Sequence, residues 1–329
     1  MNTKTKITAA LIAALAIVTT TASGTKAQSG YPDRPVHMVL GYPPAGPVDI
    51  IARIVADRLS QIWNQPVIVE NVSGAGGNIG GDRVAKAAPD GYTILMATNA
   101  QVAINPSLYA KMTYDPAKDL VPISQAVYSP NILVVPNDVP AKSVNELVAF
   151  ARANPGKLSF ASAGVGTTQH LAGELFKAMA KIDIQHVPYR GAGPMITDLL
   201  GGRITMAFIA IALAIPLVRE GKLRALAVTS AKRFGASPDL PTMIEAGYPG
   251  FESILSIGLM APKGTPPAIV EKIHQDTVKA LAPPEVRTRL SDIGMEVIGN
   301  SPAEFAAAIK AETPQWAKVI KDAGIAASN

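Results

Sequence analysis

Four glycine-rich turns hold the residues of this chain best suited to binding chemistry. Each turn follows a short apolar run and precedes a segment with a helical pattern. A turn of this kind leaves the first N–H groups of the helix without intrahelical partners, and these donors attract anions together with the helix dipole. If several such turns faced one cleft, they would bind a small carboxylate or phosphate. The turns span residues 41–46, 73–78, 162–167 and 189–194.

The first two turns allow both a structural and a binding interpretation. Gly46 can cap a helix, Pro47 suits the first helical position, and the Asp49 carboxylate complements the dipole just after it. Capping alone and ligand binding by the N–H groups near Ala45 both remain open. Asp49 would repel an anion, so we interpret it as structural. In the second turn, Asn78 can cap the next helix, contact a ligand, or do both.

The third turn combines the most polar groups. Ser162 and Thr167 supply hydroxyls, while Gly164 and Gly166 permit close approach of the backbone. His170 follows in the first helical turn, where the dipole keeps its imidazole neutral and able to donate a hydrogen bond. Packing against the local backbone is the alternative role for His170.

In the fourth turn, Arg190 follows Tyr189. A guanidinium fork matches a carboxylate, although most arginines are solvated or paired at the surface.

No catalytic, nucleotide or metal motif accompanies these turns. The sequences beginning at Gly74 and Gly164 lack the last glycine of G-x-G-x-x-G, and no phosphate-binding P-loop occurs. There is no G-x-S-x-G elbow or H-E-x-x-H motif, the four histidines are dispersed, and cysteine is absent. We therefore predict no catalytic residue, metal or cofactor. An exported α/β enzyme that uses Ser162 or His170 on a small acid remains the alternative.

Composition indicates an exported, well-packed protein. Of 329 residues, 48% are hydrophobic and 17% charged, with no run of like charges, so we expect no nucleic-acid partner. Lys4 and Lys6 precede a twelve-residue apolar run at 7–18, and a cleavage site follows Ala27. This pattern predicts a signal peptide over residues 1–27, because a membrane anchor needs about 20 apolar residues. Export without disulfides is compatible with a bacterial periplasm.

Short apolar segments alternate with helical patterns, which predicts an α/β fold with largely parallel sheets. Pro314 should kink or split the last helix, and residues 204–218 should form a buried strand and a short helix. Turn residues near 128–130 and 247–250 mark two crossovers between lobes. The expected strands are 36–40, 67–70, 93–97, 131–135, 158–161, 184–187, 204–209 and 223–229.

The glycine turns and the segments around them, in this order, resemble the Bug-type solute-binding proteins of tripartite tricarboxylate transporters. The similarity runs from about Tyr31 to the C-terminus. The motifs that carry it are YPPAGPVD from Tyr42, GAGGNIG from Gly74, APDGYT from Ala88, INPSLY from Ile104, VPYRG from Val187, GKLRALAVT from Gly221, DLPT from Asp239 and EAG from Glu245.

The resemblance implies a type II-like periplasmic binding protein of two α/β lobes, joined by crossover strands around a ligand cleft. Lobe 1 would comprise residues 28–127 and 253–329, and lobe 2 residues 128–252. The protein would act as a monomer that passes a small carboxylate to inner-membrane permease subunits, or reports it to a sensor. The implied ligand-binding residues are Tyr42, Pro44, Ala45, Gly46, Asn78, Thr98, Asn99, Ser162, Ala163, Gly164, Gly166, Thr167, His170, Tyr189, Arg190 and Ile209.

The chain departs from the family pattern at one position that bears on the ligand. An aspartate that can meet a ligand's ammonium often follows the position of Phe208 in the family, whereas this chain has Ile209. We therefore expect a dicarboxylate or an aromatic acid in preference to an amino acid.

Overall fold

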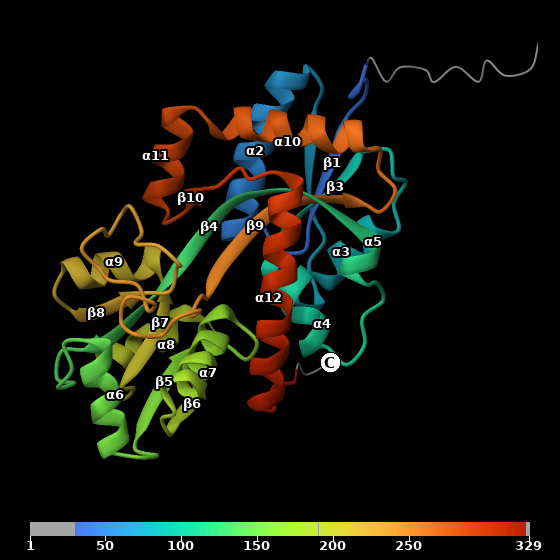
Figure 1. The fold of residues 1–329 in the computed structure, drawn as a ribbon. Coiled ribbons are helices and arrows are strands. Elements are labelled where there is room, and N and C mark those ends of the chain that lie inside the picture. Colours follow the sequence, from blue (N-terminus) through green and yellow to red (C-terminus); the bar gives the residue numbers. More distant parts are fainter. Residues whose placement is uncertain (1–29, 190, 327–329) are drawn as a thin grey trace, which may run out of the picture. The chain divides into compact units, whose positions relative to one another are not determined.

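The computed structural model describes residues 30–189 and 191–326. The chain divides into two units, Met1–Asp33 and Arg34–Asn329. All the helices and strands described below belong to the second unit (Figure 1). The signal peptide predicted for residues 1–27 lies outside the described residues and remains a prediction. Among the described residues, no helix has the length and apolar character needed to cross a membrane.

A mixed sheet forms the centre of the second unit, with strand order β2-β1-β3-β9-β4-β7-β5-β6. The strands β2-β1-β3 and β6-β5-β7 are parallel groups at its two ends, whereas β4 and β9 run antiparallel to their neighbours. Strands β8 and β10 each pair with β4 alone. The bounds are β1 Val36–Leu40, β2 Val67–Asn71, β3 Thr93–Thr98, β4 Leu120–Pro136, β5 Leu158–Ser162, β6 Ile184–Pro188, β7 Met206–Ala210, β8 Leu223–Val228, β9 Ile254–Pro262 and β10 Glu296–Val297.

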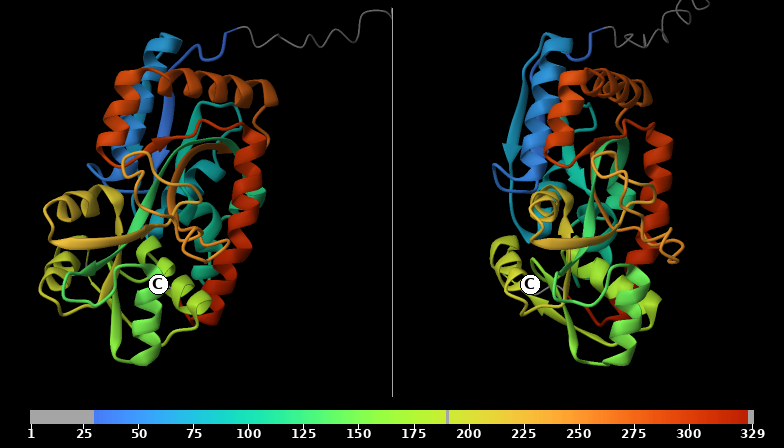
Figure 2. Two further views of the ribbon diagram at one scale, coloured as in Figure 1. Left: turned by 60° about the vertical axis from the view of Figure 1, so that its left-hand side comes forward. Right: turned by 90° about the vertical axis from the view of Figure 1, so that its left-hand side faces the viewer.

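Strand β4 links the two α/β lobes, because its first part pairs with β9 and its last part pairs with β7 and β8. Helices pack on each lobe, and α12 runs alongside both (Figures 1 and 2). The helices are α2 Pro47–Trp63, α3 Asn78–Ala85, α4 Asn105–Leu108, α5 Pro116–Asp119, α6 Val144–Ala153, α7 Thr168–Ala180, α8 Ala192–Leu200, α9 Ile211–Arg219, α10 Pro267–Leu281, α11 Pro284–Asp292 and α12 Pro302–Asp322.

The hydrophobic core extends through both lobes, and α12 contributes to it at two levels. Phe305, near the start of α12, packs with buried residues of β1 and β3. Trp316, Val319 and Ile320, near its end, pack with buried residues of α6, α7 and β5. One helix therefore stabilises the sheet on both sides of the crossover strands.

The eight predicted strands occur, most of them within one residue of their expected bounds. Residues 131–135 are only the last part of the 17-residue β4, and β9 and β10 were not predicted. Expecting largely parallel sheets was wrong for the centre, since β4 and β9 pair antiparallel over about ten residues. Residues 204–218 form strand β7 and helix α9, as predicted.

Of the two outcomes predicted for Pro314, a kink or a split, the split does not occur, because α12 continues through Pro314 as a single helix. Proline removes the hydrogen bond to the carbonyl four residues earlier, which here belongs to Lys310. Both Lys310 and Pro314 are exposed, so water can satisfy that carbonyl. The long apolar face of α12 stabilises the helix on the opposite side.

Close glycine contacts bring the start of α3 against the end of β1. A Cβ atom at Gly41 would lie 2.4 Å from the carbonyl oxygen of Gly77, and one at Gly80 would lie 2.9 Å from the Cα of Gly41. Any larger residue would push the second turn away from the first. The sequence thus uses glycine here for packing as well as for turn geometry.

Candidate functional site

Three of the four glycine turns meet at one cavity of about 440 Å³, which we call the cleft cavity. Its lining comes from β3 and the turns before α2 and α3 in one lobe, and from the turn before α7 in the other. Leu255 of β9 also lines it. The lining residues are Tyr42, Pro47, Val48, Gly76, Thr98, Ala100, Asn105, Leu108, Tyr109, Val165, Gly166, Thr167, Thr168, Gln169 and Leu255.

The N-terminus of α2 forms one wall of the cleft cavity. Pro47 at the first helical position has no N–H, and the N–H groups of Val48 and Asp49 have no hydrogen-bond partner among the described residues. The N–H of Ala45, which we predicted as a ligand donor, instead bonds the Asp49 carboxylate at 3.0 Å. The donors of this turn are therefore the helix amides.

Asp49 has the structural role predicted for it. Its buried carboxylate accepts hydrogen bonds from the guanidinium of Arg53, the side-chain amide of Asn71 and the N–H of Ala45. The Arg53 hydrogen bond is the main reason that the pKa of Asp49 falls to about 2. These hydrogen bonds hold the charged carboxylate of Asp49 within the turn.

The N-terminus of α7 forms the opposite wall. Its N-cap Thr167 accepts from the N–H of His170, while Gly166 donates to the imidazole Nδ1 of His170 and Gly164 donates to the hydroxyl of Ser162. The amides of Gly164 and Gly166, two predicted ligand-binding residues, are thus already paired. The N–H groups of Thr168 and Gln169 have no partner among the described residues, and both residues line the cavity.

A tyrosine–threonine pair lies between the two helix ends. The Tyr42 hydroxyl is 2.6 Å from the Thr98 hydroxyl and 3.3 Å from the carbonyl oxygen of Gly76. Burial raises the pKa of Tyr42 to about 12, against the opposing effect of the Thr98 hydrogen bond, so the phenol stays protonated. One hydroxyl donates to the other, so the pair has one remaining proton to donate to an anion in the cavity.

The INPSLY segment supplies cavity residues that the sequence analysis did not assign to the site. Strand β3 ends at Thr98, and a π-helical turn, Ala100–Ile104, leads directly into α4. Wide turns of this type often occur at functional sites. The Asn105 amide bonds the Gly76 carbonyl at 3.1 Å, which ties α4 to the second turn. The INPSLY motif was visible in the sequence, but its place in the cavity depends on the π-helical turn before it, which was not predicted.

His170 and Ser162 lie beneath the α7 turn, away from the cavity lining. The His170 ring stacks on His186 with centroids 3.9 Å apart, and Ser162 Oγ lies 2.7 Å from His186 Nε2. Burial lowers the pKa of each histidine to about 4, so both rings are neutral near pH 7. Their direct contact with a ligand, predicted from the sequence, has no support from their position.

The buried Ser162–His186 pair does not form a reactive arrangement. Ser162 is fully buried, and its hydroxyl already interacts with both the N–H and the carbonyl of Gly164. No described carboxylate hydrogen-bonds the His186 ring. A serine nucleophile must reach its substrate and needs an oriented base, so this geometry gives no support to the enzymatic alternative.

Other predicted site residues lie next to the cleft cavity or elsewhere. Asn78, at the start of α3, accepts a hydrogen bond from the side-chain amide of Asn105 on α4, and Asn99 faces a different cavity. Ile209, predicted as a ligand-binding residue, is 1% exposed in the core around β7 and does not line the cleft cavity. Leu108, Val165 and Leu255 supply apolar lining instead. Tyr189 bonds Asp198, and Arg190 lies outside the described residues. Ala163, Pro44 and Gly46 are in the turns but not in the lining.

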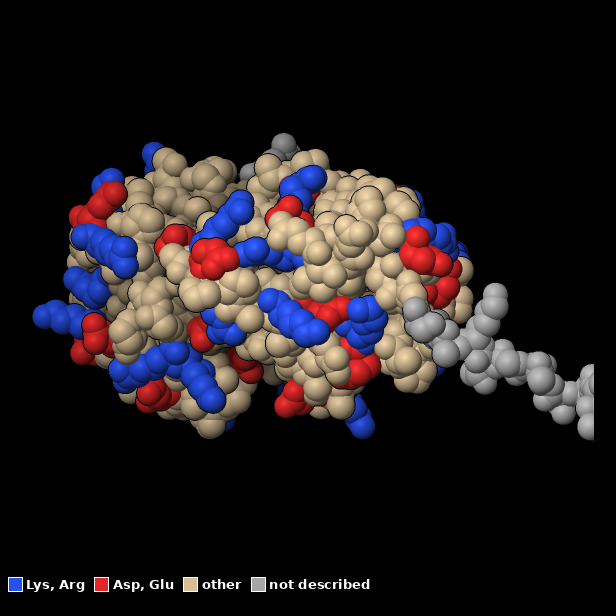
Figure 3. Space-filling model, turned by 90° about the horizontal axis from the view of Figure 1, so that it is seen from above, with Lys and Arg blue, Asp and Glu red and all other residues tan. Residues whose placement is uncertain are grey.

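Among the described residues that line the cleft cavity, none carries a formal charge. On the face shown in Figure 3, basic and acidic side chains are interspersed without a single-sign stripe. Neutral donors at two helix N-termini therefore face the same cavity, with apolar side chains between them. This arrangement suits a carboxylate on a hydrocarbon body.

Comparisons with known proteins agree with this geometry. Residues 51–325 match the family described as the tripartite tricarboxylate transporter family receptor. BugT of Bordetella pertussis is 37% identical over 295 residues, which cover 89% of this chain and 90% of BugT.

Two solved structures from Rhodopseudomonas palustris are similar over nearly their full length. One, solved with adipate, is 38% identical with a TM-score of 0.74 and covers 90% of this chain and 99% of its own. The other, MatC with bound malate, is 33% identical with a TM-score of 0.71 and covers 88% of this chain and 100% of its own. The fold, the cleft and the match over 275 of 329 residues together establish that this chain belongs to the Bug-type receptor family of tripartite tricarboxylate transporters.

Proposed function

We propose that this protein is a periplasmic receptor that binds a small organic carboxylate in the cleft cavity and delivers it to a membrane permease, without catalysing a reaction. The observation that carries the proposal is the pair of helix N-termini, α2 and α7, which direct unpaired N–H groups into one cavity. Dipoles of this kind stabilise an anion where the described lining has no cation.

The ligand we propose is a dicarboxylate or an aromatic acid. An amino acid would need a partner for its ammonium group, and the described lining of the cleft cavity has no acidic side chain. Val48, Leu108 and Leu255 offer apolar contact to a carbon chain or ring instead. Relatives solved with adipate and malate support the carboxylate class.

We further propose the lobe boundaries expected from the sequence, residues 28–127 with 253–329 and residues 128–252, with closure about β4 and β9. A ligand that contacts both lobes favours the closed state by its differential affinity. The signal peptide at residues 1–27 would export the protein, which would then work as a monomer.

Isothermal titration of ligand-free protein tests the proposal. We expect adipate, malate or benzoate to bind, and adipamide, which matches adipate in shape without its charge, to bind at least about tenfold more weakly because it forms no charge-assisted hydrogen bonds. The acid should be recovered unchanged after prolonged incubation. If no acid in the panel bound to folded protein shown by mass spectrometry to be ligand-free, the proposal would be wrong. Catalytic loss of the acid would favour the enzymatic alternative.

A further inference from the structure

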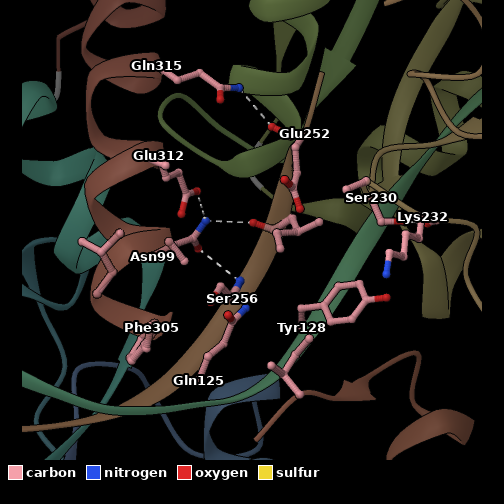
Figure 4. Close-up of a pocket in the computed structure, with 16 residues that line it drawn as sticks. Asn99, Gln125, Tyr128, Ser230, Lys232, Glu252, Ser256, Phe305, Glu312 and Gln315 are labelled. Atoms are coloured by element: carbon pink, nitrogen blue, oxygen red, sulfur yellow. Dashed lines mark hydrogen bonds between the residues drawn. The ribbon is translucent and has the colours of Figure 1, made fainter. Parts of the chain in front are cut away.

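A second cavity of about 400 Å³ lies beside α12, and we call it the α12 cavity (Figure 4). Its walls are α12, the crossover strands β4 and β9, and the loop residues 230–232 and 252. Ile254 and Ser256 of β9 line it, whereas Leu255 between them lines the cleft cavity. Successive strand residues point to opposite faces, so the two cavities lie on opposite sides of β9.

Two buried polar side chains face the α12 cavity without full hydrogen bonding. Ser256 is 5% exposed, and its hydroxyl has no partner among the described residues. Gln125 is 8% exposed; its carbonyl oxygen accepts from Asn300, while its NH₂ group has no partner there. The Ser256 hydroxyl and the Gln125 NH₂ group are not fully enclosed, so both remain available to hydrogen-bond a polar molecule in the cavity.

Carboxylates dominate the charge of this cavity. Glu312 on α12 and Glu252 on the opposite wall extend toward the same space in Figure 4. Glu312 accepts hydrogen bonds from the Asn99 amide at 2.6 Å and the Trp316 indole at 2.7 Å through one oxygen, and its other oxygen has no described partner. Neither glutamate forms an ion pair with a described residue.

Two further features define what could bind there. Lys232 is the only described cation in the lining, and it is exposed and forms no ion pair with either glutamate. Burial is the main cause that raises the pKa of Glu312, and the nearby charge of Glu252 raises it further. The hydrogen bonds from Trp316 and Asn99 oppose this effect only in part. Phe305, Ile309 and Ile254 form an apolar wall beside the acids.

We propose that the α12 cavity is a second binding site, which takes a small molecule with a protonated amine on an apolar body. The ammonium group would pair with Glu312 and Glu252 and donate to the Ser256 hydroxyl, while Phe305 and Ile309 contact the carbon chain. This site is separate from the proposed carboxylate site, since it lies across β9 and has the opposite charge preference.

Ligand-observed NMR and isothermal titration with n-butylammonium test the proposal, with n-butanol as the uncharged control of equal size. At pH 8 we expect butylammonium to bind at least about tenfold more tightly than butanol, since only the ammonium forms a charged hydrogen bond. Its affinity should fall as the pH is lowered, because the raised pKa of Glu312 lets a proton compete with the ammonium group for the empty site.

Variants on α12 separate the site from a general effect of charge. Glu312→Gln keeps an oxygen for Asn99 and Trp316, and it should weaken butylammonium binding by about tenfold. Asp322→Asn makes the same charge change on the same helix outside this cavity and should have no effect. Ala308→Trp fills the cavity from an exposed position and should abolish binding.

Adipate binding and thermal melting report that each variant is folded and that the cleft cavity is intact. Equal affinity for butylammonium and butanol would overturn the proposal, and so would unchanged butylammonium binding in folded Glu312→Gln. Absence of butylammonium binding to folded wild-type protein would also refute it, whether or not a carboxylate binds in the cleft.

Discussion

Replacing Gln169 by glutamate should affect ligand binding and protein stability in opposite directions. Gln169 occupies the second position of α7, where its unpaired N–H and its half-buried side chain face the cleft cavity. A negative side chain in the first helical turn complements the helix dipole, so we expect the free energy of unfolding to rise by about 0.3–1 kcal/mol. The same charge would repel a carboxylate bound at that helix end.

The size of the repulsion follows from the geometry of the turn. An anion bonded to the Thr168 or Gln169 N–H lies about 3 Å from the nitrogen, which places it roughly 5 Å from a glutamate carboxylate at position 169. At an effective dielectric constant of about 20–30, two charges at this separation repel by about 2–3 kcal/mol. This energy corresponds to binding weaker by roughly 30-fold to 150-fold.

Titration calorimetry with the best-binding acid, together with urea denaturation, measures both effects. Gln169→Met is the control, because it removes the amide without adding charge and should change affinity by less than about fivefold, as expected for one neutral hydrogen bond. Raising the salt concentration to about 1 M should recover part of the affinity of Gln169→Glu. If folded Gln169→Glu bound the acid as tightly as the wild type, the N-terminus of α7 would not be the anion site.

Three further predictions concern stability and protonation. The pKa values of His170 and His186 are lowered to about 4, below the unfolded value of about 6.5, so their contribution to stability is complete above pH 6.5 and is lost as the pH falls toward 4. NMR titration of the ring resonances should find both rings neutral at pH 5.5. A titration midpoint near 6.5 would contradict this prediction. Ala45 has a φ of 64°, which costs a non-glycine residue about 1–2 kcal/mol, whereas glycine costs about 0.4–1 kcal/mol through the greater entropy of the unfolded chain. Ala45→Gly should therefore raise the free energy of unfolding by up to about 1 kcal/mol, as measured by urea denaturation. A clear loss of stability would show that Ala45 is not strained. A Cβ at Gly173 would lie 2.0 Å from the Phe160 ring, so Gly173→Ala should destabilise the protein by about 1–3 kcal/mol. A Cβ at Gly193 in helix α8 would meet no atom within 4 Å, so the matched change Gly193→Ala should stabilise the protein by about 0.5–1 kcal/mol. Equal effects of the two variants in thermal melts would show that packing does not distinguish the two positions.

The sequence predicted the parallel parts of the fold well because they depend on local patterns. Apolar runs such as residues 36–40 and 158–161 end in glycine turns, and both the strand and the turn are visible within about ten residues. Strand β9 was not predicted, because its pairing with β3 and β4 joins residues more than 100 positions apart. The antiparallel centre of the sheet therefore had no short-range signal.

For the candidate site, the sequence indicated the turns but not which donors remain unpaired. Whether the N–H of Ala45 or Gly166 is available depends on the side chains that bond it, which are Asp49 and His170. Glycine patterns show where a backbone can approach a ligand, whereas the partners of each amide depend on three-dimensional geometry. The position of His170 beneath the turn likewise follows from its stacking on His186, which lies on strand β6.

The alternation of side chains along β9 has a consequence for how the two cavities can change over time. Leu255 faces the cleft cavity, while its chain neighbours Ile254 and Ser256 face the α12 cavity. Insertion or deletion of one residue before this segment would exchange the two faces along the rest of the strand, and so would place residues suited to one cavity in the lining of the other. New ligand preferences on either side can therefore arise by point replacement, but not by a change in strand length.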